Sequence, residues 1–98
     1  MLSKEPIDMS KVGKEDQDRE ILRLSIIAEL DAVSLYEELA AMTDNQDMKK
    51  VLEDVAREEK THVGELQTLL LIEDKEQVQE LAEGKKEVEE LLVGKRSS

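Results

Sequence analysis

Three side chains that could bind a metal ion occupy positions where packed helices usually carry apolar residues. Apolar side chains recur at alternating gaps of four and three residues in two stretches, residues 22–40 and residues 48–69. Such spacing is typical of helices that pack side by side. Glu29 interrupts the first stripe, and Glu59 and His62 interrupt the second. Because a carboxylate removed from water costs several kcal/mol unless a partner binds it, these positions need an explanation.

Glu59 and His62 form a Glu-x-x-His pair. On an α-helix, residues i and i+3 share a face, so the carboxylate and the imidazole can reach one ion. The pair alone is weakly specific, because 25 of the 98 residues are acidic. Together with Glu29 it makes a donor set of two carboxylates and one imidazole, which suits iron, manganese or zinc rather than Cu(I).

The predicted turn brings Glu29 to the height of this pair. The residues from Thr43 to Gln46 favour a turn between two helices, expected over about residues 14–42 and 46–71. A connection this short makes the helices an antiparallel hairpin. Folding the chain about the turn places residue 29 opposite residue 60, between the two members of the pair. The alternative is that these side chains extend past the packed stripe into water. Lys85, at the corresponding stripe position of the C-terminal segment, shows that such stripes tolerate a charged residue.

The sequence divides into three expected segments. Residues 1–14 contain Pro6 and Gly13 and are predicted to be a mobile tail without a motif. Residues 15–72 form the helical hairpin. Residues 73–98 keep a weaker helical spacing, interrupted by Gly84, and are expected to form a short C-terminal helix followed by a linker or tail. The predicted fold class is therefore all-α.

The composition excludes several functions. A net charge of −11 argues against contact with nucleic-acid phosphates or with an anionic membrane surface. The chain has no cysteine, and hence neither a disulfide nor a thiolate metal site. No apolar run is long enough to cross a bilayer, and the amino-terminal residues do not form a secretory signal. We therefore expect a cytoplasmic protein.

The ligand count predicts that two copies of the chain share the site. Four-helix bundles that hold two iron or manganese ions use a Glu from each of two helices and a Glu-x-x-His from each of the other two. One hairpin supplies half of that set. Two hairpins packed face to face would complete it on a twofold axis and would also bury both apolar stripes.

With this ligand pattern, the chain resembles the encapsulated ferritins. The stretches that carry the resemblance are Ala28–Val33, Leu35–Tyr36 and Arg57–His62. The resemblance implies that two chains complete a ferritin-like four-helix bundle with a ferroxidase centre at their interface. It also implies that Glu29, Glu59 and His62 of each chain bind iron, two ions per dimer, and that Tyr36 lies near the centre in a supporting role.

Further partners are implied by the same resemblance. Five dimers would form a ring inside an encapsulin shell, where the iron that the protein oxidises with oxygen is mineralised. The family tends to carry an acidic pair where metal ions enter; here the two positions are Ala28 and Asp31, which leaves Asp31 as a candidate. An aromatic residue commonly precedes the tyrosine, whereas this chain has Leu35. Residues 92–96 resemble either a short targeting sequence, by which a cargo protein binds the encapsulin shell, or a linker to a fused shell protein.

Three other functions are alternatives to the ferroxidase, and the structural coiled coil is the strongest of them. In a structural coiled coil, the polar residues of the stripes would set the register of the paired helices. Dimerisation would then not depend on metal, and the fold would become more stable if Glu29 and His62 were leucine. A peroxide reductase of the rubrerythrin type is disfavoured because the chain lacks the cysteines of a rubredoxin electron donor. A hydrolase is disfavoured because no nucleophile motif accompanies the single histidine.

Overall fold

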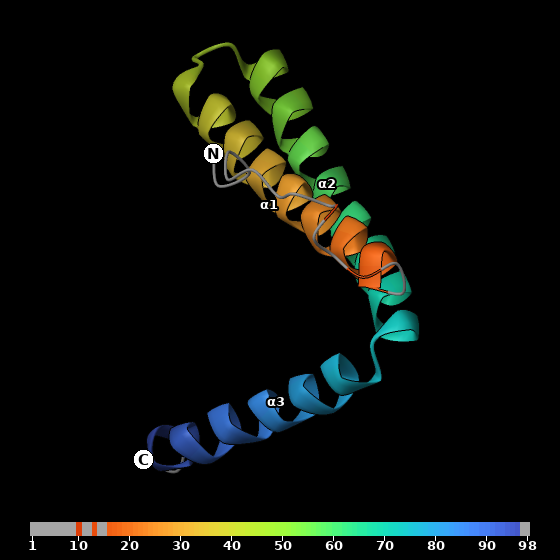
Figure 1. The fold of residues 1–98 in the computed structure, drawn as a ribbon. Coiled ribbons are helices and arrows are strands. Elements are labelled where there is room, and N and C mark those ends of the chain that lie inside the picture. Colours follow the sequence, from red (N-terminus) through yellow and green to blue (C-terminus); the bar gives the residue numbers. More distant parts are fainter. Residues whose placement is uncertain (1–9, 11–12, 14–15, 97–98) are drawn as a thin grey trace.

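The computed structural model describes residues 10, 13 and 16–96. They contain three helices: α1 (Gln17–Met42), α2 (Gln46–Glu73) and α3 (Lys75–Arg96). Figure 1 shows α1 and α2 lying side by side, while α3 leaves the far end of the hairpin in a different direction. The predicted all-α class and antiparallel hairpin are confirmed. Apart from Ser10 and Gly13, the predicted tail at residues 1–14 lies outside the described residues.

The hairpin turn is held by side chains that complete both helix ends. The Asn45 side-chain oxygen accepts hydrogen bonds from the backbone N–H groups of Asp47 (3.0 Å) and Met48 (3.1 Å), which caps the start of α2. Lys49 Nζ donates to the Ala40 carbonyl at 3.2 Å. This bond satisfies one of the free carbonyls at the end of α1, whose last turn has no basic residue of its own. The turn residues therefore fix the antiparallel pairing.

The core of the single chain is thin. Val33 and Ala40 of α1 and Ala56 and Leu70 of α2 are its buried hydrophobic residues in the part that the structure describes. The two alanines let the helices approach closely, but they bury little surface. Fifteen large hydrophobic residues of the described chain remain exposed. This much uncovered apolar surface is typical of a chain that another protein surface covers.

The structure refines the predicted stripe of α2. Of the positions expected to pack, Leu52, Glu59 and Leu66 are partly buried, whereas Met48 and Leu69 are each 52% exposed. The residue most buried on α2 is Ala56, at 2% exposure, which is not in the predicted stripe. The helix is therefore rotated so that one edge of its stripe faces α1 and the other edge faces outward. Close approach at Ala56 explains the rotation.

A polar clamp joins α3 to α1 at the bend after α2. The buried Asp74 accepts a hydrogen bond from the Gln77 backbone N–H at 3.0 Å through Oδ1, and its Oδ2 lies 2.9 Å from Arg23 Nη2. Arg19 Nε donates to the Glu73 carbonyl at 3.0 Å. Asp74 thus caps α3 and ties it to the hairpin at once.

Beyond this bend, α3 extends away from the hairpin (Figure 1). It is one continuous helix of 22 residues that runs through Gly84, so it is longer than the short helix predicted. It also continues to Arg96, where a linker or tail was expected; the final two residues lie outside the described part. None of the helices in the described residues is long and apolar enough to cross a membrane.

The clamp predicts a pH dependence of stability. The Gln77 N–H and the Arg23 guanidinium lower the pKa of Asp74. A group whose pKa falls on folding stabilises the fold above its unfolded pKa, about 3.9 for Asp, and loses that contribution as the pH drops through the folded value. Since asparagine still caps a helix, Asp74→Asn removes mainly the charge.

We expect Asp74→Asn to lower the melting temperature at pH 7, and we expect the difference from the wild type to shrink as the pH falls well below about 3.9. Circular dichroism melts across this range measure the effect. Glu76→Gln, which removes an exposed carboxylate from the first turn of α3, serves as the control. A difference that is independent of pH would contradict the role given to the ion pair.

Candidate metal centre

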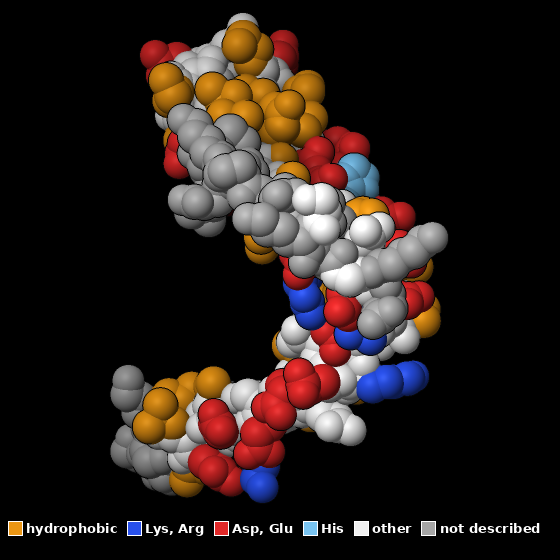
Figure 2. Space-filling model, in the orientation of Figure 1, with side chains coloured by type: hydrophobic (Ala, Val, Ile, Leu, Met, Phe, Trp, Pro, Cys, Tyr) orange, Lys and Arg blue, Asp and Glu red, His pale blue; other side chains and the backbone are white. Residues whose placement is uncertain are grey.

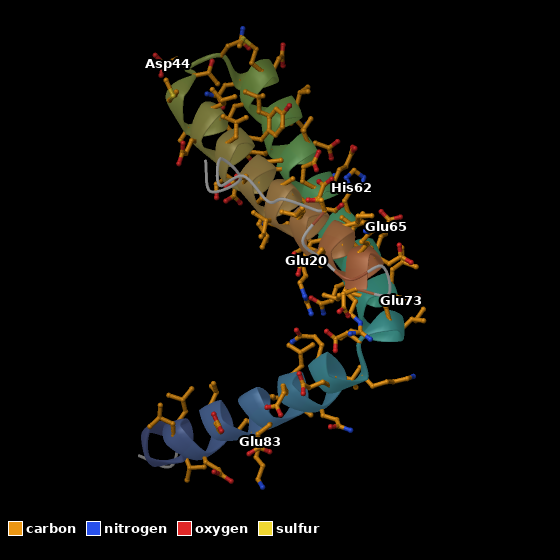
Figure 3. The ribbon with its side chains drawn as sticks, viewed as in Figure 1. Glu20, Asp44, His62, Glu65, Glu73 and Glu83 are labelled. Carbon is orange, nitrogen blue, oxygen red and sulfur yellow. The ribbon has the colours of Figure 1, made fainter. Side chains whose placement is uncertain are left out.

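Glu29 of α1 meets Glu59 and His62 of α2 in the structure. Each offers one ligand atom, and these atoms all lie within 4.8 Å of one another. His62 Nδ1 is 3.3 Å from Glu59 Oε2 and 3.5 Å from Glu29 Oε2. Figure 3 shows the labelled His62 projecting from α2 part-way along the hairpin. The three residues that the stripes and the turn predicted to meet are therefore brought together; their role as metal ligands stays a prediction.

The burial of these side chains is uneven. The Glu59 and Glu29 side chains are 19% and 27% exposed, whereas the His62 side chain is 45% exposed. Glu29 Oε2 is buried and has no hydrogen-bond partner. The nearby imidazole could form an ion pair with it only when protonated. A buried carboxylate oxygen without a donor is costly, and a bound cation would remove that cost.

The donor chemistry also fits a metal ion. Two carboxylates and an imidazole provide hard oxygen and nitrogen ligands, which suit iron, manganese or zinc. The residues are held on two packed helices and not on a loop, so their spacing is set by the hairpin. Among the described residues, these three form the group with metal-ligand spacing. One chain offers too few ligands to enclose two ions.

The cluster lies on one flank of the hairpin, which we call the site flank. Helical spacing from Glu29 and His62 places five exposed apolar residues on it: Ile21, Leu39, Met48, Val51 and Leu69. Ile21 and Leu69 line one shallow depression, which supports their placement together. Figure 2 shows hydrophobic side chains over the turn end of the hairpin, with acidic side chains and the histidine beside them. The open side of the cluster thus belongs to an apolar surface.

The opposite flank has a different character. Lys60 Nζ lies 3.2 Å from Glu37 Oε2 and bridges α1 to α2 there. Both side chains are more than half exposed, so the pair contributes little to stability. This flank thus carries an exposed ion pair, whereas the site flank carries the open side of the metal-ligand cluster and five exposed apolar residues.

Tyr36 and Asp31 lie outside the cluster. Tyr36 is partly buried and follows Glu29 by seven residues, which is two turns or about 10 Å along α1 on the same face. It is therefore a neighbour of the centre and not a member of it. Asp31 is two residues from Glu29, or about 200° around the helix, so the two do not share a face. The supporting role of Tyr36 and the place of Asp31 on a path for entering metal ions stay predictions.

The Arg23–Asp74 clamp was not foreseen from the sequence. A signal was present, since Asp74 is followed three positions later by Gln77, as in a helix-capping box. That pattern predicts the start of a helix at residue 75. It does not reveal the arginine 51 positions earlier that pairs with the aspartate.

Comparison with known proteins agrees with the fold. The family model described as rubrerythrin matches residues 20–94. The crystal structure of the encapsulated ferritin domain from Pyrococcus furiosus superposes with a TM-score of 0.79 at 48% identity, over 91% of this chain and 95% of that one. The chain belongs to the rubrerythrin family, as an encapsulated ferritin. The predicted resemblance is thereby confirmed.

Two curated relatives extend this result. The ferritin-like-encapsulin shell fusion protein of Pyrococcus furiosus is 53% identical over 83 residues, which are 83% of this chain and 24% of the relative. The encapsulin nanocompartment cargo protein EncC of Myxococcus xanthus is 39% identical over 71 residues, 69% of this chain and 55% of the relative. The chain thus spans about a quarter and about half of these two proteins.

Proposed function

We propose that this protein is a ferroxidase that oxidises Fe(II) to Fe(III) at a di-iron centre shared by two copies of the chain. The observation that carries the proposal is the buried Oε2 of Glu29, which has no hydrogen-bond partner, beside Glu59 and His62. A cation is the partner that this oxygen lacks, and the family is one of ferritin-like proteins. Iron is the substrate of the reaction and occupies the centre during it.

A second copy completes the centre. Two chains related by a twofold axis supply four carboxylates and two imidazoles, the full ligand set of a di-iron four-helix bundle. The site flank favours this pairing because it carries exposed apolar residues on both sides of the cluster along the hairpin, which another hairpin would bury. A twofold interface uses the same surface on both partners, so one apolar flank is enough.

Each ligand has a defined task in this proposal. Glu29 and Glu59 would bind or bridge the two ions through their carboxylates, and His62 would add one imidazole nitrogen from each chain. The four carboxylate charges balance two Fe(II) ions and stabilise the higher charge of Fe(III) more strongly, which favours oxidation. Oxygen accepts the electrons. Tyr36 supports the centre by hydrogen bonding or electron supply.

The names of the relatives point to a compartment. One is an encapsulin nanocompartment cargo protein, and the other is fused to an encapsulin shell. We propose that this protein also works inside an encapsulin shell in the cytoplasm, as a ring of five dimers. Three helices of 26, 28 and 22 residues are too small to enclose a mineral core by themselves, so the shell would hold the oxidised iron. Residues 92–96 would act as the shell address or as part of a linker to the shell.

Aerobic addition of Fe(II), followed by the absorbance of Fe(III), tests the proposal. The wild type should oxidise iron rapidly and saturate near one iron per chain. We expect Glu59→Ala to lower the rate to that of buffer, because the variant removes two of the shared carboxylates. Glu58→Ala is the matched control, since it removes the adjacent, exposed carboxylate. A wild-type rate equal to that of buffer would refute the ferroxidase and favour a structural helical protein.

A further inference from the structure

Met48 places an oxidisable thioether in the apolar part of the site flank. It lies in the first turn of α2 and is 52% exposed in the single chain. Leu39 and Val51, the other apolar residues of this flank near the turn, are 37% and 62% exposed. Figure 2 shows hydrophobic side chains gathered at this end of the hairpin. A second copy that completes the metal centre would cover Met48 together with these neighbours.

The composition makes methionine the residue of this protein that an oxidant attacks most readily. The sequence contains no cysteine and no tryptophan, one tyrosine and four methionines. Met42 and Met48 belong to the part of the chain that the structure describes, whereas Met1 and Met9 lie outside it. Oxidation of a methionine to its sulfoxide converts a flexible apolar side chain into a polar one and disrupts apolar interfaces. An oxidant that reaches Met48 would therefore act on the surface that pairs two chains.

The proposed reaction supplies such an oxidant. Two Fe(II) ions at the shared centre release two electrons. Together with two protons, these electrons reduce one oxygen molecule to one molecule of hydrogen peroxide. Reduction of oxygen to water needs four electrons, which is twice the number that one centre releases. Hydrogen peroxide is thus the product expected from a single turnover, and this source of the oxidant rests on the proposed function.

We propose that hydrogen peroxide oxidises Met48 of an unpaired chain and so prevents that chain from forming the site dimer. The O–O bond of the peroxide breaks, one oxygen atom bonds to the sulfur of Met48, and the other oxygen leaves as water with both hydrogens. The sulfur loses the two electrons that the peroxide gains. Because pairing would cover the thioether, the oxidation takes place before two chains meet.

The sulfoxide adds a strongly polar oxygen to a surface that pairing would remove from water. The side chains of Leu39 and Val51 have no hydrogen-bond donor to offer it. A polar group buried without a partner opposes the association that buries it. Each oxidised chain would thus be withheld from a shared centre, so iron oxidation would slow as hydrogen peroxide accumulates.

Met42 provides a comparison within the same chain. It is 79% exposed, so peroxide reaches it at least as easily as Met48. It is the last residue of α1 and follows Glu29 by 13 residues. That spacing places it about 140° from Glu29 around the helix, on the face turned away from α2. A sulfoxide at Met42 would therefore remain in water when two site flanks pair.

The test treats dilute, iron-free protein with hydrogen peroxide in the presence of a metal chelator and then removes both reagents. Peptide mass spectrometry locates the sulfoxides, sedimentation measures the assembly at micromolar concentration, and aerobic Fe(II) addition measures the activity. We expect the treated wild type to lose the site dimer and to oxidise iron at least tenfold more slowly than its untreated sample. Methionine sulfoxide reductases should restore both properties.

Two leucine variants identify the responsible residue. Leucine has a volume similar to that of methionine and no sulfur to oxidise. Relative to its own untreated sample, Met48→Leu should keep its assembly and its rate after peroxide, whereas Met42→Leu should lose both as the wild type does. A wild-type protein that carries the sulfoxide at Met48 and still forms the site dimer would overturn the proposal. So would an equal loss in Met48→Leu, or peroxide treatment that leaves Met48 unmodified.

The untreated samples separate this inference from the proposed function. An untreated protein that forms the site dimer but does not oxidise iron would refute the ferroxidase, and sedimentation of the treated sample would still test the effect of Met48 oxidation on pairing. A treated protein that oxidises iron at the full rate with its Met48 converted to the sulfoxide would overturn the role of Met48 and leave the ferroxidase standing.

Discussion

Replacing Glu29 by leucine should stabilise the metal-free protein and abolish iron oxidation. The variant removes a carboxylate whose Oε2 is buried without a donor and places an apolar side chain in an otherwise apolar stripe. An unsatisfied buried polar group costs about 1–3 kcal/mol, and Glu29 remains partly exposed, so we expect a gain of about 1 kcal/mol in the free energy of unfolding. Loss of two shared ligands should reduce the rate of oxidation by about 100-fold or more.

Urea unfolding in a metal chelator measures the stability, and aerobic Fe(II) addition measures the activity. Glu38→Leu changes an exposed carboxylate of the same helix and should leave both quantities close to those of the wild type. A Glu29→Leu protein that is more stable without metal but does not oxidise iron would identify a carboxylate whose role is to bind metal and not to stabilise the fold. A Glu29→Leu protein that is less stable without metal would instead show that the carboxylate contributes to packing, and one that oxidises iron normally would exclude Glu29 from the centre.

A change on the site flank far from the ligands should be nearly as damaging. Leu69 is 52% exposed, follows His62 by two turns and shares its edge of α2. Leu69→Glu would place a charge in the proposed dimer interface, and symmetry would place a second one on the other side of the twofold axis. Unpaired charges buried at an interface cost several kcal/mol, so we expect monomers at micromolar concentration and at least a tenfold slower oxidation of iron.

The structure offers a matched control on the other flank. Leu30 is also 52% exposed, and helical spacing places it on the flank that carries the Glu37–Lys60 ion pair. Leu30→Glu introduces the same charge without approaching the cluster and should preserve the site dimer and its activity. Sedimentation and Fe(II) oxidation report the two effects. Equal losses in both variants would contradict the assignment of the site flank as the dimer interface.

Local rules account for the hairpin and for the meeting of the three ligands. Apolar spacing predicts two long helices, and the turn-forming Asn45 marks where one ends and the next begins. Once the turn is known, the helical rise fixes which residues are opposite each other. Glu29 could therefore be matched to Glu59 and His62 without coordinates, and the structure brings their ligand atoms within 4.8 Å.

Helical spacing and the position of the turn do not predict the direction in which each ligand side chain faces. Regular spacing defines a stripe, but a stripe has two edges, and packing decides which edge faces the neighbouring helix. Close approach at Ala56 turns one edge of α2 toward α1 and leaves His62 and Leu69 on the outer edge. The cluster is consequently open on one flank. The pattern of apolar and polar residues along the sequence does not predict this opening.

The bend before α3 shows most clearly which features follow from neighbouring residues in the sequence and which depend on contacts between distant residues. The residues Asp74 and Gln77 predict a helix start, because a capping interaction is local in sequence. The pairing of Asp74 with Arg23 joins residues 51 positions apart and sets the direction of the following helix. The sequence therefore determines the helices, their turn and the ligand types, since these depend on neighbours along the chain. Exposure, the open flank and the path of α3 depend on contacts between distant residues, and only the tertiary structure decides them.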